Sequence, residues 1–361
     1  MSLIETEPLL KTRPERPSVI PISPEFQTEW EMYKKAEASF WTAEELKLND
    51  DKKQWRMLDQ LKGRDEAENI RELVKNIFGF FSGADGLVNE NLAENFTSQI
   101  RIPEINCFYG FQIAIENIHN EVYGLLIQNA ELTDEEQRKL LNAINEMENI
   151  SALYDWVKKW IKRTPEDELR ENPKLDPENS RDQELAVIWC FAKRLAAFVC
   201  VEGILFSGPF CAIFWLKSQG LFPGLTFANE LISRDEGMHT LFGAHLYKNQ
   251  IINKPPAEQV LEIVTEAVEF KQAFMDTFLG RLQGLNRTNM SQYLEYVGDR
   301  ILGFLGYPKH YDTPLPLELK FMEKISFDGM TNFFEKRVGE YSLGGFEDEE
   351  EENGNLLVED F

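Results

Sequence analysis

The chain has 361 residues, of which 43% are hydrophobic, so it is long enough to bury a substantial core. Its formal net charge of −24 excludes an extended nucleic-acid interface, because phosphate binding needs a basic surface. The four cysteines form no Cys-x-x-Cys pair, and we find neither an apolar run of about 20 residues nor a secretory signal at the start. We therefore expect a cytoplasmic protein with reduced thiols and no membrane span.

The first 23 residues contain four prolines among charged residues and show little periodicity. Such a composition favours a mobile arm over residues 1–23, followed by a helical domain over residues 24–310. Just inside the domain, Thr42 and Glu45 form a capping box for one helical turn. Beyond it, apolar residues recur at intervals of three and four, which predicts helices over residues 65–95, 103–129, 133–160, 181–217, 226–254, 256–284 and 288–306.

Two interruptions of this helical pattern are predicted. Residues 164–180 are charged and contain Pro165, Pro173 and Pro177, so we expect a surface loop there. Gly208 and Pro209 lie inside the predicted helix 181–217, and we expect a kink or local unwinding at these two residues. The helices 256–284 and 288–306 are interpreted as packing elements without chemistry.

A carboxylate and an imidazole recur at the same spacing in two of these helices. Glu116 and His119 lie three residues apart, and Tyr123 follows four residues later, so all three share one otherwise apolar face. Glu236 and His239 repeat the Glu-x-x-His spacing. Burying such a pair is costly unless a hydrogen bond or a metal ion receives it. The alternative is a surface glutamate beside a satisfied core histidine.

Two single acids support the metal interpretation. Asp85 and Glu202 each lie in an otherwise apolar helical run. Two Glu-x-x-His helices with one carboxylate from each of two further helices form the dimetal pattern of ferritin-like bundles. We therefore predict an all-α, ferritin-like helical bundle with additional helices and a dimetal-carboxylate site in its core.

The helical periodicity fades after Pro308. We divide the rest into a C-terminal segment, 311–345, and an acidic flexible tail, 346–361, which carries too much like charge to fold alone. The tail ends in the apolar hexapeptide Leu356–Phe361. This pattern is typical of a docking peptide for a groove on a partner, and the alternative is a disordered tail without a partner.

Similarity to one known family runs from about Phe40 to the C-terminus. It is carried by the segments Phe40–Glu45, Asp85–Asn91, Cys107–Ala114, Glu116–His119, Val201–Gly203, Ser233–Gly237 and Asn332–Tyr341. Together they resemble the small, radical-generating subunit of class I ribonucleotide reductase, in its eukaryote-like branch. Compared with that family, the 164–180 loop is longer, Pro209 replaces a small residue, and the final hexapeptide is not the commonest version.

The resemblance implies a metal centre and a radical. The ligands of two metal ions per chain would be Asp85, Glu116, His119, Glu202, Glu236 and His239. Dioxygen reacting at the reduced metals would oxidise Tyr123 to a stable tyrosyl radical, and Phe206, Phe210 and Ile232 would shield that radical from reductants. A buried tyrosine without the family context would be ordinary core.

The resemblance also implies that the radical equivalent passes to a large subunit, where ribonucleotides are reduced to deoxyribonucleotides. The matching positions are Trp41, Asp235 and His119 near the metals and Tyr341 further along the chain, while Leu356–Phe361 would dock on the large subunit. It further implies a homodimer. From its position next to Glu236, Asp235 is a candidate to accept a hydrogen bond from His119 and fix the tautomer of that imidazole.

Other functions share parts of this pattern. A stand-alone dimetal oxidase, hydroxylase or desaturase would need a substrate cavity beside the metals and no docking tail. An iron-binding or storage protein would leave Tyr341 and the tail without a use, and a metal-free scaffold would leave acids and histidines unpaired in apolar stripes. Carboxylates and imidazoles suit both iron and manganese, and Tyr123 favours the iron form with a tyrosyl radical.

Overall fold

The computed structural model describes residues 2–13, 16, 18–277, 279, 282 and 284–324. Side chains are described at all of these positions except 85–90, 93, 144, 148, 149 and 151–154. Over these residues the backbone is helical, and the only β pairing among them is an isolated bridge between Leu282 and Leu285. The prediction of an all-α fold is therefore confirmed.

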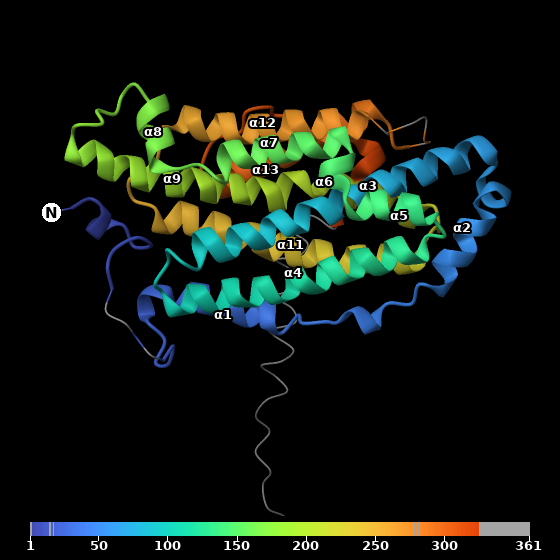
Figure 1. Cartoon of the computed structure of the whole chain (residues 1–361), viewed down its shortest axis with the longest axis horizontal. Coiled ribbons are helices and arrows are strands. Elements are labelled where there is room, and N and C mark those ends of the chain that lie inside the picture. Colours follow the sequence, from blue (N-terminus) through green and yellow to red (C-terminus); the bar gives the residue numbers. More distant parts are fainter. Residues whose placement is uncertain are drawn as a thin grey trace, which may run out of the picture.

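The long helices run side by side along the longest axis of the molecule (Figure 1). Their bounds are α1 Gln27–Glu37, α2 Asn49–Lys62, α3 Arg64–Asn91, α4 Pro103–Asn129, α5 Asp134–Leu141, α6 Ala143–Glu146, α7 Glu148–Trp160, α8 Pro165–Glu171, α9 Ser180–Cys200, α10 Ser207–Ser218, α11 Pro223–Gln250, α12 Ala257–Asp276 and α13 Arg287–Leu305. Two π-helical turns, Leu92–Phe96 and Val201–Leu205, follow α3 and α9, and a 3₁₀ segment, Leu317–Lys324, follows α13.

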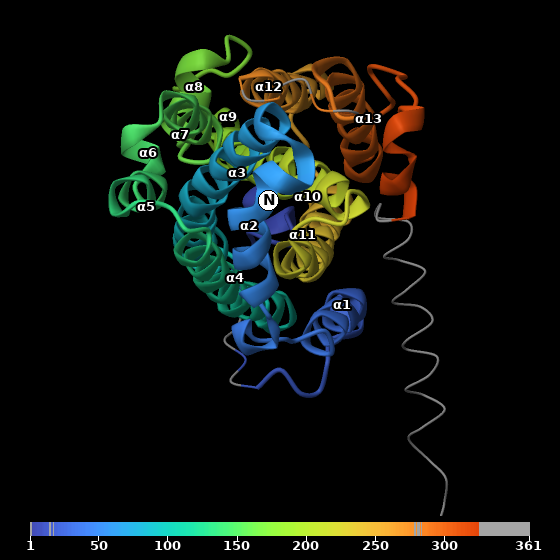
Figure 2. The ribbon, with the colours of Figure 1, turned by 90° about the vertical axis from the view of Figure 1, so that its right-hand side faces the viewer.

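The core of the bundle lies between four long helices. Helix α3 packs on α4, and α9 packs on α11, so that apolar stripes from all four meet along the axis. Helices α12 and α13 pack on each other and on α9, and α1 covers α4 from the opposite side (Figure 2). The run Ser180–Ser218 is long and apolar enough to cross a membrane, yet its most apolar window is completely buried inside the bundle, as expected of a central core helix.

The N-terminal arm packs against the domain. Glu7 is fully buried, and its carboxylate accepts hydrogen bonds from the backbone N–H groups of Ile252 at 2.9 Å and Asn253 at 2.7 Å. Leu9 joins the hydrophobic core. The expectation of a mobile arm over residues 1–23 is therefore wrong for residues 2–13, because a buried acid and a buried leucine anchor them.

The predicted helix 133–160 is divided into α5, α6 and α7. Asn142 and Met147 adopt non-helical conformations between them, with φ/ψ of −116°/30° and −119°/111°. Leu141, the last residue of α5, is exposed.

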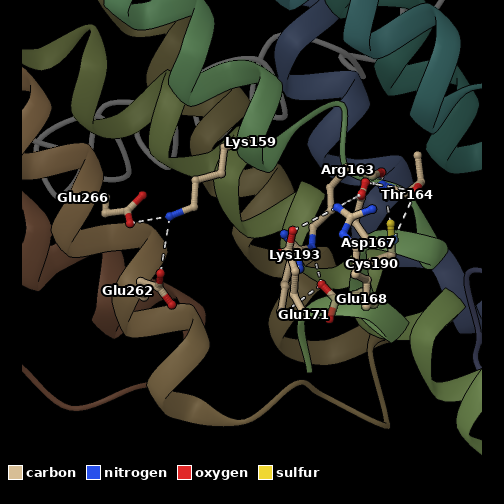
Figure 3. Close-up of polar contacts among 11 residues, drawn as sticks. Lys159, Arg163, Thr164, Asp167, Glu168, Glu171, Cys190, Lys193, Glu262 and Glu266 are labelled. Atoms are coloured by element: carbon tan, nitrogen blue, oxygen red, sulfur yellow. Dashed lines mark hydrogen bonds and ion pairs between the residues drawn. The ribbon is translucent and has the colours of Figure 1, made fainter. Parts of the chain in front are cut away.

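Residues 164–180 are not a plain loop, because they contain α8. Thr164 caps this helix by accepting a hydrogen bond from Asp167 N, a Thr-x-x-Asp capping box that the sequence displays. Glu168 of α8 is fully buried and forms ion pairs with Arg163 and with Lys193 of α9, the latter at 2.8 Å (Figure 3). The segment is thus docked on α9 through buried charges.

Candidate metal centre

Helix α4 buries the first group of predicted site residues. Pro103 occupies the first turn, where backbone N–H groups form no hydrogen bond within the helix, so proline costs none there. The helix then continues unbroken to Asn129. Glu116, His119 and Tyr123 all lie on the buried face of this helix. The bland interpretation, a surface glutamate beside a core histidine, is therefore wrong, because the Glu116 side chain is fully buried.

Helix α11 buries the second group. Asp51 of α2 caps its start, since the carboxylate accepts hydrogen bonds at 2.7 Å from the backbone N–H groups of Gly224 and Leu225. Three to four turns further along α11, Asp235, Glu236 and His239 lie on its buried face. Both Glu-x-x-His pairs therefore point into the same interior.

Glu202 comes from the π-helical turn Val201–Leu205 that separates α9 from α10. The irregularity lies upstream of Pro209, not at Gly208 and Pro209 as the sequence predicts. Proline has no N–H to bond the carbonyl of residue 205, and its ring crowds that carbonyl, so the distortion falls on the preceding turn. Such π turns are frequent at functional sites, and this one carries a candidate ligand.

The π turn is packed tightly against its surroundings. A Cβ atom at Gly203 would clash with Ile301 of α13 and would lie 2.9 Å from Cγ2 of Thr240 in α11, so glycine permits the close approach. Gln112 of α4 donates a hydrogen bond from Nε2 to Oε1 of Glu202 at 3.0 Å. Gln112 lies four residues before Glu116 on the same face of α4, yet the sequence analysis did not identify it.

The structure brings five predicted ligands together in one cluster. One ligand atom from each of Glu116, Glu202, Glu236 and His239 lies within 4.8 Å of the others. Nδ1 of His119 lies 3.3 Å from Glu116 and 3.1 Å from Glu236, and Nδ1 of His239 lies 3.0 Å and 2.8 Å from the same two residues.

The electrostatics of the cluster fit bound cations. Burial and the charges of Glu236 and Glu116 raise the pKa of Glu202 well above 4.5. Burial alone would lower the pKa of His239, but Glu236 and Glu116 raise it to about 9. Burial also opposes ionisation of Glu116, yet the two histidines lower its pKa to about 2. The cluster therefore attracts positive charge to a buried position.

Hydrogen bonding supports the same conclusion. Among the described residues, both carboxylate oxygens of Glu116, Oε2 of Glu202 and Nδ1 of His119 are buried and form no hydrogen bond of good geometry, although His239 and His119 approach Glu116 to 3.0 Å and 3.3 Å. Buried polar atoms are nearly always satisfied, and a metal ion satisfies carboxylate and imidazole atoms together. The residues present therefore fit a metal centre of oxygen and nitrogen ligands.

A hydrogen-bonded chain leaves the cluster through His119. Nε2 of His119 lies 3.2 Å from Oδ2 of Asp235, and the same oxygen accepts a hydrogen bond from Nε1 of Trp41 at 2.6 Å. The indole and imidazole rings are stacked at 5.9 Å. Arg234 donates to Oδ1 of Asp235 and, at 2.7 Å, to the carbonyl of Ser39, which holds the Trp41 segment against α11. The predicted contact between Asp235 and His119 is present.

Tyr123 lies in an aromatic pocket. Its ring stacks on Phe81 of α3, with centroids 4.4 Å apart and planes inclined by 8°. Phe206 and Phe210, two of the three predicted pocket residues, contact Phe81 at centroid distances of 5.7 Å and 5.4 Å. The third, Ile232, is buried. Phe81 is a pocket residue that sequence reasoning missed, although it lies four residues before Asp85 on the same helical face.

Several predicted site residues lie outside what the structure describes. The backbone of Asp85 belongs to α3, but its side chain is among those not described. Tyr341 and the hexapeptide Leu356–Phe361 lie beyond residue 324, the last residue described. Their roles remain predictions from the sequence.

Comparison with known proteins agrees with this arrangement. The family model "Ribonucleotide reductase, small chain" matches residues 22–316. The chain is 45% identical to the ribonucleoside-diphosphate reductase subunit M2 of Danio rerio, over 99% of this chain and 84% of that protein. It is 44% identical to the small chain of Trypanosoma brucei brucei, over 94% of this chain and 90% of that protein.

A solved structure extends the comparison to the fold. The ribonucleotide reductase Rnr4 homodimer from Saccharomyces cerevisiae superposes with a TM-score of 0.70 at 30% identity, covering 94% of this chain and 93% of that one. Family model, sequence relatives and fold thus agree over nearly the whole chain. The chain belongs to the ribonucleotide reductase small-chain family.

Proposed function

We propose that this chain is the radical-generating subunit of a ribonucleoside-diphosphate reductase and stores one oxidising equivalent on Tyr123. The observation that carries the proposal is the buried cluster of carboxylates and imidazoles on α4, the π turn and α11, with Tyr123 two turns from Glu116 on the same helix. Asp85, Glu116, His119, Glu202, Glu236 and His239 would hold the two metal ions, with Asp85 included on sequence grounds. Bound metals would supply the one-electron oxidation of the phenol at the expense of dioxygen.

The residues around Tyr123 suit this task. The phenol loses an electron and a proton. Phe81 stacks on its ring, and Phe206 and Phe210 pack on Phe81, so this side of the ring faces apolar groups and not water or reductants. Trp41, Asp235 and His119 supply a buried route for the equivalent away from the metals. Tyr341 would continue that route to the large subunit.

Metal stoichiometry tests the centre itself. Metal-free protein titrated without oxygen should bind two ferrous or manganous ions per chain. His239→Ala should lose at least one of them, whereas His310→Ala, at an exposed histidine, should bind as the parent does. Binding of many ions per chain would favour an iron-storage protein, and oxygen uptake with a small organic substrate would favour a stand-alone oxidase.

The partner is a ribonucleotide reductase large subunit in this proposal. The peptide Leu356–Phe361 would dock in an apolar groove of that subunit, because an acidic tether presents apolar side chains to it. A synthetic peptide of this sequence should then compete with the chain and inhibit reductase activity, whereas a scrambled peptide should not. Inhibition by both peptides, or by neither, would contradict docking through the tail.

We also propose that the chain forms a homodimer and is cytoplasmic. The yeast relative is described as a homodimer. Cys190, Cys200 and Cys211 are buried, and none of the four cysteines forms a disulfide, which suits a reducing compartment. Light scattering on the purified chain should give twice the mass of one chain.

A further inference from the structure

Lys271 of α12 is buried, and the described part of the chain offers its charge no acidic partner. Its side chain has no exposed surface, and its Nζ atom forms no hydrogen bond with any described residue. The amine lies over two aromatic faces, 3.3 Å from the ring centroid of Phe80 and 4.2 Å from that of Phe274. Lysine is almost never fully buried unless it is paired, so this position calls for a physical explanation.

The ring beneath this amine is linked to Tyr123. Phe80 packs edge-to-face on Phe81 at 5.6 Å and on Phe206 at 5.8 Å. Phe81 in turn stacks on the Tyr123 ring at 4.4 Å. Each of these contacts prefers a defined ring orientation, because aromatic rings carry a quadrupole with a negative face and a positive edge. Two ring contacts therefore connect Lys271 to the proposed radical site.

The chemistry of the amine suits a positioning role. Burial lowers the pKa of Lys271 well below 10.5, which favours the neutral amine. Its Nζ atom lies 3.3 Å from the ring centroid of Phe80, where an N–H can point at the negative face of the ring, a directional contact that an apolar side chain of the same length cannot make. The aliphatic part of the Lys271 side chain is also closely packed, because α12 lies against Gly208 of α10. A Cβ atom on Gly208 would lie 3.2 Å from Met275 and 3.6 Å from Cγ of Lys271.

We propose that Lys271 is a positioning residue for Tyr123: its amine fixes the Phe80 ring, which fixes Phe81 and thereby the orientation of the tyrosine. The part of this proposal that concerns the radical rests on the proposed function. The part that concerns ring orientation does not, since it applies to the metal-free protein too.

The first experiment uses metal-free protein with 3-fluorotyrosine incorporated at position 123. Lys271→Met removes the amine and keeps the length of the side chain, while Met275→Leu, on the same helix, is the matched control for repacking. The ¹⁹F resonance should shift in Lys271→Met and stay at the parent position in Met275→Leu. An unchanged resonance in Lys271→Met, or an equal shift in the control, would overturn the proposal.

A second variant keeps the test decisive if Lys271→Met folds poorly. Phe80→Leu removes the ring that the amine contacts and should also shift the resonance. If Lys271 acts through Phe80, the double variant should show the shift of Phe80→Leu alone, because the two changes break one chain of contacts. Additive shifts would show that Lys271 does not act through Phe80.

The radical provides an independent readout. After iron and oxygen treatment, the Tyr123 radical of Lys271→Met should decay about two- to fivefold faster than in the parent, the factor that corresponds to one weak N–H···π contact. Its β-proton hyperfine splitting should change, since that splitting follows the ring orientation. Parent-like decay and splitting would contradict the proposal. Absence of a radical in the parent would instead contradict the proposed function and leave the ¹⁹F result as the test.

Discussion

Nε1 of Trp41 donates a hydrogen bond of 2.6 Å to Oδ2 of Asp235, although 194 positions separate the two residues in the chain. The same oxygen contacts His119, so one carboxylate joins the Trp41 indole to the candidate metal centre. Both residues are almost completely buried. The contact gives the proposed relay a continuous path through the described part of the protein.

Replacing Trp41 should separate radical storage from radical export. In Trp41→Phe the indole N–H is lost while the aromatic packing remains, so the Tyr123 radical should still form. Turnover with the large subunit should fall by roughly 10²-fold or more, as when a reacting group is misplaced. The measurement is radical content by electron paramagnetic resonance beside nucleotide reduction. Trp30→Phe is the control, and parent-like turnover in Trp41→Phe would contradict the relay.

Glu202 should make the metal-free protein less stable and the metal-loaded protein more stable. Glu202→Gln removes one of three crowded carboxylates while retaining a side chain that Gln112 can bond, so the metal-free variant should melt at or above the parent temperature. The parent should gain about 2.7 kcal/mol when free Mn²⁺ is 100-fold above its dissociation constant. The variant should gain clearly less at the same concentration. Thermal unfolding with and without Mn²⁺ measures both effects, and an equal gain would contradict a ligand role.

Lys271 should make stability depend on pH. Burial lowers the pKa of Lys271 in the folded protein, whereas in the unfolded chain this pKa is about 10.4. Between these two pKa values the amine is neutral when folded and protonated when unfolded, so unfolding takes up a proton. The parent should therefore gain stability as pH rises, by at most about 1.4 kcal/mol per pH unit, until pH approaches about 10. Lys271→Met should lack this gain.

Urea unfolding at pH 7, 8 and 9 measures the effect. The free energy of unfolding of the parent, relative to that of Lys271→Met, should rise with pH, whereas the exposed control Lys53→Met should differ from the parent by a constant amount. A pH-independent difference between Lys271→Met and the parent would show that this amine is not neutral in the folded protein.

The buried acid of α8 should be important for stability. Glu168→Leu would leave Lys193 buried without its counter-charge and Arg163 with Glu171 alone, and removing one partner of a buried ion pair costs about 3–5 kcal/mol. Glu258→Leu removes a partner from an exposed ion pair with Lys174 and should cost less than about 1 kcal/mol. Equal urea midpoints for the two variants would contradict an anchoring role for Glu168.

Local sequence signals predicted the helices that carry the candidate centre. Helix α4 begins at Pro103 and ends at Asn129, as its proline and its apolar repeat indicate. The recurrence of Glu-x-x-His predicted that Glu116, His119, Glu236 and His239 share one interior, because each pair lies on an apolar helical face. Spacing within a helix is sufficient for such predictions.

Features that depend on packing between helices were missed or misplaced. The stacking of Phe81 on Tyr123 requires the approach of α3 to α4, which no local pattern encodes. The irregular turn at Glu202 was placed too late, because a proline affects the carbonyl four residues before it. Lys271 did leave a signal, since it is a single lysine in the apolar stripe of α12, but we interpreted that helix as packing alone.

Electron paramagnetic resonance on the parent and on Tyr123→Phe tests the central claim most directly. Both proteins are loaded with ferrous iron without oxygen and then exposed to oxygen. We predict a long-lived organic radical in the parent that is absent from the variant. If iron binds and is oxidised but no such radical appears in either protein, the tyrosyl-radical assignment is contradicted, and manganese loading or a stand-alone oxidase becomes the function to test.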